Sequence, residues 1–124
     1  MIRVIALVSA LITLGLPVRA EVRLLMLEAP GCSWCARWHA EVGDAYALTA
    51  EGRTAPLLRA QIRAELPAGI ALARPALFTP TFVLLHDGAE VGRIEGYPGE
   101  HFFWPLLGQL LGGLPAELQK DPRS

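Results

Sequence analysis

Two cysteines separated by two residues carry the clearest chemistry in the sequence. Cys32 and Cys35 are the only cysteines among 124 residues, and they lie in the stretch Ala29-Pro30-Gly31-Cys32-Ser33-Trp34-Cys35. This spacing is typical of a thiol–disulfide redox pair. A structural crosslink is the alternative interpretation, but a bridge across two residues closes a very small loop and would stabilise the fold little. The spacing therefore favours redox chemistry.

The segments on either side of the pair predict that it lies at the start of a helix. Residues 22–27 form an apolar run interrupted by one arginine, which is typical of a strand covered on both faces. Residues 33–42 have a helical pattern, ending or kinking at Gly43, with the apolar stripe Trp34, Trp38 and Val42. Unpaired N–H groups at a helix N-terminus stabilise an anion, so the pKa of the Cys32 thiol should fall below about 8.5. Cys35 would face the same side and attack a mixed disulfide at Cys32.

The rest of the chain predicts further strands and a final helix. A short helix capped by Thr49 comes first, followed by strands at 57–62, 79–86 and 89–95 and a helix at 102–111, with at most a short helix within 64–77. Asp87-Gly88 is a strong hairpin signal. Pro105 is tolerable if it lies in the first turn of the last helix. This order of elements indicates an α/β fold with a mixed sheet.

The first twenty residues have the features of a secretory signal peptide. Arg3 precedes an apolar run at 5–16, and Val18-Arg19-Ala20 provides small residues for cleavage. A membrane anchor is the alternative, but the run is shorter than the ~20 apolar residues that a span requires.

The domain organisation follows from this division. We expect a signal peptide at 1–20, one domain at 21–114 and a flexible C-terminal tail at 115–124. The formal net charge is −1 and the chain has no basic tract, so nothing indicates binding to nucleic acid.

The chain resembles the thioredoxin superfamily, in a shortened form without the N-terminal strand and helix of thioredoxin itself. The resemblance is carried by Cys32-Ser33-Trp34-Cys35 after a strand, by Thr79-Pro80 at the start of another strand, by Asp87-Gly88 and by Gly96-Tyr97. Further strings, such as Pro30-Gly31-Cys32 and Gly92-Arg93-Ile94-Glu95-Gly96-Tyr97-Pro98-Gly99-Glu100, look like the SoxS-type periplasmic thioredoxins found with bacterial sulfur-oxidation genes. The resemblance implies a minimal thioredoxin-like fold, in which a four-stranded mixed sheet is flanked by helices.

The resemblance also implies roles for individual residues. Cys32 would be the attacking, more exposed cysteine, Cys35 the resolving one, and Pro80 a cis-proline facing the pair. X-Pro bonds adopt cis at low cost, and a bend there would expose the backbone of Thr79 for pairing with an extended substrate. A simple strand-start proline is the alternative. Trp34 would be a surface aromatic that shapes the choice of partner or only covers Cys35.

The sequence departs from thioredoxin around the pair. Gly31 stands where thioredoxin has a tryptophan, and Ser33-Trp34 replaces Gly-Pro. No acidic residue matches the buried carboxylate of thioredoxin that helps to move the proton of the resolving cysteine. Glu28 and His39 are nearby candidates, although the sequence favours an exposed helix histidine as the interpretation of His39.

The resulting hypothesis is a periplasmic thiol–disulfide oxidoreductase without a cofactor. Its partners would be protein disulfides, including a sulfur-oxidation carrier with a reactive cysteine, and a membrane electron donor of the thiol-transporter type; we expect a monomer. One alternative is a periplasmic oxidase or isomerase of protein folding, because the sequence leaves the redox direction open. Another is a soft-metal module using Cys32, Cys35 and His39, which would lack the fourth ligand of a structural zinc site.

Overall fold

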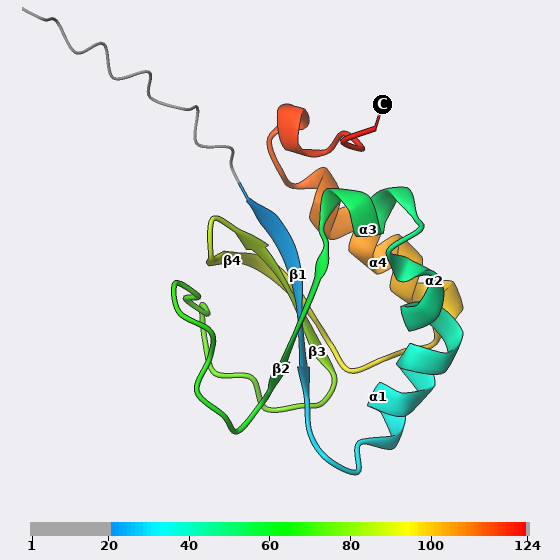
Figure 1. Cartoon of the computed structure of the whole chain (residues 1–124), viewed down its shortest axis with the longest axis vertical. Helices are drawn as coiled ribbons and strands as arrows, with labels where there is room; N and C mark the ends of the chain where they lie inside the picture. Colours follow the sequence, from blue (N-terminus) through cyan, green and yellow to red (C-terminus); the bar gives the residue numbers. More distant parts are fainter. Residues whose placement is uncertain (1–20, 124) are drawn as a thin grey trace, which may run out of the picture.

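The computed structural model describes residues 21–123, so the predicted signal peptide lies outside the described residues. Four strands form one mixed sheet in the order β2-β1-β3-β4 (Figure 1). The strands are β1 (Val22–Glu28), β2 (Leu57–Gln61), β3 (Thr81–His86) and β4 (Ala89–Glu95). β1 and β2 are parallel, whereas β3 is antiparallel to both β1 and β4. The predicted α/β fold with a four-stranded mixed sheet is confirmed.

The connection from β1 to β2 is helical for most of its length. It contains α1 (Ser33–Trp38), a π-helical turn (His39–Gly43), α2 (Asp44–Tyr46) and α3 (Ala50–Thr54). The prediction that the first helix ends or kinks at Gly43 is wrong in its first alternative, because Gly43 keeps helical angles and the chain stays helical to Tyr46. The helix is nevertheless irregular there, since the π-helical turn ends at Gly43. The helical path continues because the buried stripe continues, through Trp38, Val42 and Tyr46. Trp34 does not belong to this stripe and is 51% exposed.

The short helix α3 is held at its start by a threonine, as predicted. The hydroxyl oxygen of Thr49 accepts a hydrogen bond from the N–H of Gly52 at 3.0 Å, which satisfies one of the free donors of the first turn. Gly52 packs so closely on the preceding turn that a Cβ atom there would lie 1.8 Å from the carbonyl oxygen of Tyr46. A glycine is therefore required where α3 folds back on α2.

The last helix, α4 (Glu100–Gly112), differs from its predicted start and buried face. It begins two residues earlier than expected, so Pro105 lies beyond the first turn and inside the helix. Proline has no N–H, so the carbonyl of His101 lacks the donor that an α-helix normally supplies four residues on. The predicted broad apolar face is only half buried. Phe103, Leu107 and Leu111 are buried, whereas Phe102 and Leu106 are exposed.

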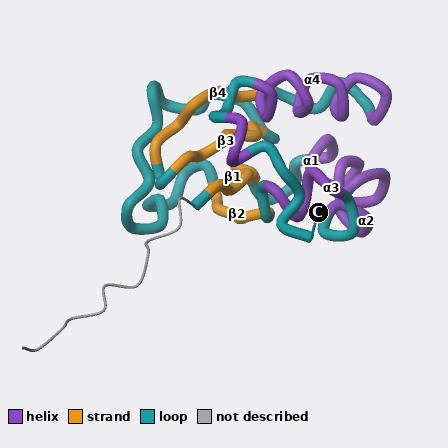
Figure 2. Tube along the Cα trace, turned by 90° about the horizontal axis from the view of Figure 1, so that it is seen from above, coloured by secondary structure: helices purple, strands orange, loops and turns teal. Residues whose placement is uncertain are grey.

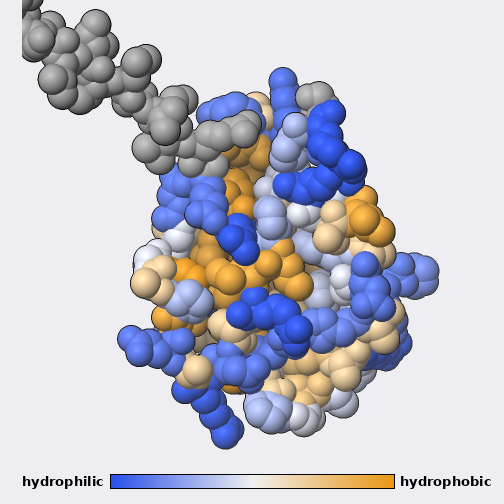
Figure 3. Space-filling view, in the orientation of Figure 1, coloured by the Kyte–Doolittle hydropathy of each residue, from blue (hydrophilic) through white to orange (hydrophobic). Residues whose placement is uncertain are grey.

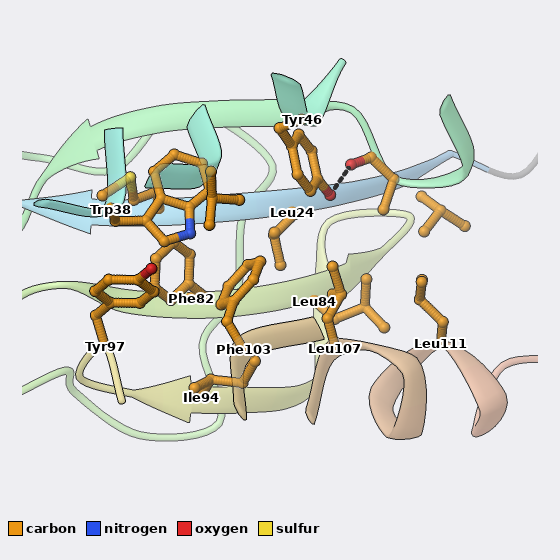
Figure 4. Close-up of a cluster of buried hydrophobic side chains, with 14 of the residues drawn as sticks. Leu24, Trp38, Tyr46, Phe82, Leu84, Ile94, Tyr97, Phe103, Leu107 and Leu111 are labelled. Carbon is orange, nitrogen blue, oxygen red and sulfur yellow. Dashed lines mark hydrogen bonds between the residues drawn. The ribbon is translucent and has the colours of Figure 1, made fainter. Parts of the chain in front are cut away.

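The main core lies between the sheet and the helices. All four α-helices lie on the same side of the sheet in both ribbon views (Figures 1 and 2). The ring of Trp38 packs at 5.1 Å from that of Phe82 and at 5.7 Å from that of Phe103 (Figure 4). The hydroxyl of Tyr46 donates to the carbonyl of Ala55 at 2.7 Å, so this buried polar group is satisfied (Figure 4).

A loop of residues 62–80 covers the other face of the sheet. No helix forms within 64–77, where the sequence allowed a short one, because Pro67, Gly69 and Pro75 interrupt the segment. Partly buried side chains of the loop pack against the sheet residues Leu25, Leu27, Val83 and Leu85; they are Leu66, Ile70, Leu72 and Ala76. Figure 3 shows apolar atoms gathered over the middle of the molecule, with hydrophilic residues around them.

Hydrogen bonds fasten this loop to the hairpin of β3 and β4. Ala71 donates to the carbonyl of Gly88 and accepts from the N–H of Glu90, at 2.9 and 3.0 Å. The guanidinium of Arg93 donates to the carbonyl of Arg74 at 2.7 Å. The turn itself has positive φ at Asp87 and Gly88, which is the type I′ geometry expected of a two-residue hairpin.

Residues 115–123, which the sequence analysis assigns to a C-terminal tail, make defined contacts. A 3-10 turn spans Ala116–Leu118, and Leu118 packs partly against the main core. The guanidinium of Arg53 donates to the carboxylate of Asp121 at 2.8 Å. The segment after α4 is therefore tied to α3 by an ion pair.

Candidate active site

The two cysteines are joined by a disulfide at the point where the chain enters α1. Their Cα atoms are 5.3 Å apart. Cys32 is the N-cap residue of α1, and its sulfur accepts a hydrogen bond from the N–H of Cys35 at 3.1 Å. Cys32 is half-buried, whereas Cys35 is 4% exposed and packs in the main core. The predicted position of the pair at a helix N-terminus is confirmed, and the two sulfurs lie in unequal surroundings.

Thr79, which precedes the buried Pro80, lines a pocket together with Trp34 from the first turn of α1. The Thr79–Pro80 peptide bond is cis, and the carbonyl of Pro80 accepts from the N–H of Gly96 at 2.7 Å. A pocket of about 380 Å³ opens here, lined by Trp34, Phe78, Thr79, Glu95, Gly96 and Tyr97. Among residues 21–123, neither the N–H nor the carbonyl of Thr79 has a backbone hydrogen-bond partner. This stretch of backbone is therefore free to pair with another chain.

A chain of polar contacts holds Trp34 at the edge of this pocket. The guanidinium carbon of Arg37 lies 5.4 Å from the centroid of the Trp34 ring, within range of a cation–π contact. The carboxylate of Glu41 accepts from Arg37 and from the hydroxyl of Tyr97, at 2.5 and 2.6 Å. These two hydrogen bonds, that from Tyr97 first, lower the pKa of Glu41. The spacing of Arg37 and Glu41 is visible in the sequence, but the contact of Glu41 with Tyr97 is not.

A buried carboxylate lies on the other side of the disulfide. Glu28, at the end of β1, has a side chain only 7% exposed. One of its oxygens lies 2.6 Å from Nε2 of His39, and the other accepts from Nε of Arg59 at 2.7 Å. Burial acts to raise the pKa of Glu28, but the hydrogen bonds from Arg59 and His39 outweigh it, so the pKa is lowered. The structure thus brings together the two residues that the sequence singles out and adds Arg59, which reasoning from the sequence missed.

Glu28 and His39 share a pocket with both cysteines. Its volume is about 420 Å³, and its lining also includes the backbone turn that leads from β1 into α1. Within residues 21–123, no three or more His, Cys, Asp or Glu side chains are arranged to hold a metal ion, and the two cysteines are engaged in the disulfide. In the same part of the chain, no helix has the length and apolar character needed to cross a membrane.

The class of protein follows from the sheet order together with the site. A strand–helix–strand unit continued by a β-hairpin and a last helix, with a Cys-x-x-Cys disulfide entering the first helix, defines a thioredoxin-fold thiol–disulfide oxidoreductase. Among solved structures, the chain is similar to the reduced form of the periplasmic thioredoxin SoxS from Paracoccus pantotrophus. The identity is 61%, the match covers 74% of this chain and 97% of that chain, and the TM-score is 0.73. The chain therefore belongs to the SoxS-type periplasmic thioredoxins. No protein-family model and no curated protein matches the chain.

Proposed function

We propose that residues 1–20 export the chain to the periplasm, where the mature domain reduces disulfides on partner proteins of the sulfur-oxidation system. A thiolate on Cys32 attacks a partner disulfide, and one partner sulfur leaves as a thiolate. A thiolate on Cys35 then attacks Cys32, which breaks the mixed disulfide and releases the second partner sulfur. The partner gains two electrons, and the Cys32–Cys35 pair ends as the disulfide.

The unequal surroundings of the two sulfurs support this assignment of roles. The N–H of Cys35 points at the Cys32 sulfur at 3.1 Å, and a hydrogen bond to an ionised acceptor is stronger than one to a neutral acceptor. This contact favours the thiolate of Cys32, which is also the sulfur that a partner can reach. The buried sulfur of Cys35 is placed to react with Cys32 alone.

We assign substrate binding to Trp34, Thr79 and Pro80, and the pocket that Trp34 and Thr79 line supports this role for those two residues. The unpaired backbone of Thr79 offers a donor and an acceptor to an extended segment, which would add to the protein as a strand. Trp34 and Phe78 supply apolar walls for a side chain of that segment. The reacting sulfur of the partner would then lie over Cys32.

The wider assignments rest on the similarity to a periplasmic thioredoxin and on the predicted signal peptide. Each turnover oxidises the cysteine pair, so a membrane donor of the thiol-transporter type must return two electrons to it. The protein substrates would include a sulfur-oxidation carrier with a reactive cysteine, and the chain would act as a monomer.

The midpoint potential of the Cys32–Cys35 couple tests the direction of the reaction. Mature protein would be equilibrated against glutathione buffers, and the fraction of oxidised pair measured by mass after alkylation. A value near that of thioredoxin, roughly −270 mV, supports a reductant. A value near that of DsbA, roughly −120 mV, contradicts the proposal and supports a periplasmic folding oxidase.

A further inference from the structure

Another pocket adjoins the one that holds the disulfide, and the exchange described above gives it no role. Its volume is about 560 Å³, and it shares Glu28 and Ala29 with the pocket that both cysteines line. Building on the proposed function, we propose that this pocket binds an acidic side chain that the partner protein carries close to its reacting cysteine. Arg63 is the residue that recognises the carboxylate.

This Arg63 pocket lies at the ends of the two parallel strands. Its lining comes from residues 28–30, where β1 ends, and from residues 61–64, where β2 ends. Glu28 pairs with Gln61, so the two chains leave the sheet side by side (Figure 1). In open α/β sheets, ligands bind outside the carboxyl ends of strands where the chain turns to opposite sides of one strand. This edge is such a place, because β2 and β3 flank β1.

The guanidinium of Arg63 is available to a ligand. Within residues 21–123 it makes no ion pair or hydrogen bond, and Arg63 is exposed. Six other arginines of this part of the chain donate to partners within the protein: Arg23, Arg37, Arg53, Arg59, Arg74 and Arg93. The backbone of Arg63 is held in a turn, because the N–H of Ala64 donates to the carbonyl of Gln61 at 3.1 Å. All five donors of a positioned guanidinium therefore remain unused.

The charges around the Arg63 pocket give it a positive balance. Burial opposes the ionisation of Glu28, but hydrogen bonds from Arg59 and His39 lower its pKa, so Glu28 is ionised and Arg59 balances its charge. Arg59 is 60% exposed and uses only two of its five donors on Glu28. Arg63 adds a charge that the pocket does not balance. Glu65 is close in sequence, but it neither lines this pocket nor pairs with Arg63.

The lining favours a carboxylate on a short apolar stem. Four residues provide apolar walls, namely Ala29, Pro30, Ile62 and Ala64. A glutamate side chain would pack its methylene groups on these walls and present its carboxylate to Arg63. The planar guanidinium binds a carboxylate through two parallel hydrogen bonds, which gives direction as well as attraction. A lysine or arginine of the partner would instead meet like charges, so the pocket selects by sign of charge.

The sheet order places this pocket within reach of a partner bound at Cys32. β1 lies between β2 and β3, so the turn from β1 to Cys32 has Arg63 on one side and Thr79, just before β3, on the other. A partner segment bound through Thr79 therefore has one flank of its cysteine towards Arg63. Side chains two residues apart on an extended segment point the same way. An acidic residue two positions from the partner cysteine would thus face the protein together with the reacting sulfur.

Short peptides with a single cysteine test this preference. The cysteine is activated as a pyridyl disulfide. The thiolate of Cys32 forms a bond to the peptide sulfur, and the leaving group takes up a proton as uncharged, absorbing pyridinethione. One pair of peptides has glutamate or glutamine two residues before the cysteine, and a second pair has it two residues after. Both ends are blocked, so the glutamate supplies the only carboxylate. Second-order rate constants are measured by stopped-flow absorbance at low salt.

We expect wild-type protein to react about two- to fivefold faster with one glutamate peptide than with its glutamine counterpart, the size of an exposed ion pair. R63Q should bring this ratio to about one, R63E should invert it, and high salt should weaken it. The matched controls are K120Q and K120E. They change the net charge equally, but the C-terminal segment lies at the other end of the molecule from the start of α1 (Figure 1), so both should keep the wild-type ratio.

The inference is overturned if wild-type protein reacts equally with glutamate and glutamine in both pairs of peptides. It is also overturned if R63E keeps the wild-type ratio, or if K120E loses the ratio as R63E does, because net charge would then explain the preference. If wild-type protein releases no pyridinethione from any peptide, the failure belongs to the proposed function and not to the Arg63 pocket.

Discussion

At the scale of single residues, the unequal burial of two bonded sulfurs predicts unequal effects of their removal. C32S should abolish the reduction of insulin by dithiothreitol, because no accessible thiol remains. C35S should lose turnover but retain the first attack, and should accumulate a stable adduct with a peptide disulfide, detectable by mass. S33A is the control and should keep wild-type activity, because Ser33 is exposed and contributes no sulfur. Turnover by C35S at the wild-type rate would contradict the proposed division of roles.

A second residue-scale prediction concerns the contacts that hold Trp34. Replacing Glu41 by Gln removes the charge that binds both Arg37 and Tyr97, so the ring loses its fixed cationic neighbour. An exposed cation–π contact is worth about 0.5–1 kcal/mol. We therefore expect KM for a peptide disulfide to rise about two- to fivefold with kcat unchanged, since each 1.4 kcal/mol is tenfold.

The control for this change is E117Q, in the exposed 3-10 turn near the C-terminus. It alters the net charge equally but lies outside the contacts around Trp34, so its kinetics should match wild type. Equal changes in the two variants would assign the effect to net charge and not to the position of the ring.

At the scale of elements, two helical glycines should respond to alanine with opposite signs. In α3, a Cβ at Gly52 would meet the backbone oxygen of Tyr46 at 1.8 Å, which forces the two helices apart. We expect G52A to lose more than about 2 kcal/mol of unfolding free energy, at the upper end of overpacking effects. In α4, Gly108 is exposed with open space around it, so G108A should gain about 0.5–1 kcal/mol. Urea unfolding of both variants measures this, and stabilisation of both would show that α3 can shift without cost.

The elements also show which features a sequence can reveal. The four strands, the Thr49 cap and the Asp87-Gly88 turn depend on local patterns, and all were predictable. The length of the first helical segment was not, because Gly43 disfavours a helix locally while packing of Tyr46 in the core continues it. The start of α4 was predicted two residues too late for a similar reason. Packing of the buried face of α4 tolerates Pro105 in the second turn, which the local sequence disfavours.

The candidate site divides in the same way. The cysteines, Trp34, Thr79 and Pro80 belong to short strings with characteristic spacing, so their positions could be anticipated. The contact of Arg59 with Glu28 joins residues from two strands, and that of Tyr97 with Glu41 joins a loop to a helix. Such contacts depend on register and crossover geometry, which a single sequence does not reveal.

At the scale of the whole molecule, ion-paired carboxylates predict a loss of stability in acid. Hydrogen bonds from Arg53 and from the N–H of Arg123 lower the pKa of Asp121 from 3.8 to about 2, and that from Arg93 lowers the pKa of the buried Glu90 below 4.5. The unfolded chain therefore binds more protons than the folded one between these values, so stability falls as the pH drops. We expect the free energy of unfolding to be level above about pH 5.5 and to decline from about pH 4.5 towards pH 2.

The contribution of Glu90 can be separated by substitution. E90Q should be less stable than wild type at pH 7, because Arg93 is left in a buried site without its charged partner. Its stability should also decline less steeply below about pH 4.5, because one shifted carboxyl is gone. Urea titrations at a series of pH values measure both effects, and parallel curves for the two proteins would exclude Glu90 as a source of the acid sensitivity.

The loop of residues 62–80 has a consequence for how proteins of this kind diversify. Its earlier part is anchored to the sheet, but Leu77 and Phe78 are exposed just before Thr79, and Phe78 lines the pocket beside the disulfide. A helix in this place would accept insertions only in whole turns, whereas a loop changes length at small entropic cost. Proteins with this fold can therefore vary the loop residues at the edge of the pocket, and with them the partner proteins that bind there. The sheet and the cysteine pair can stay unchanged.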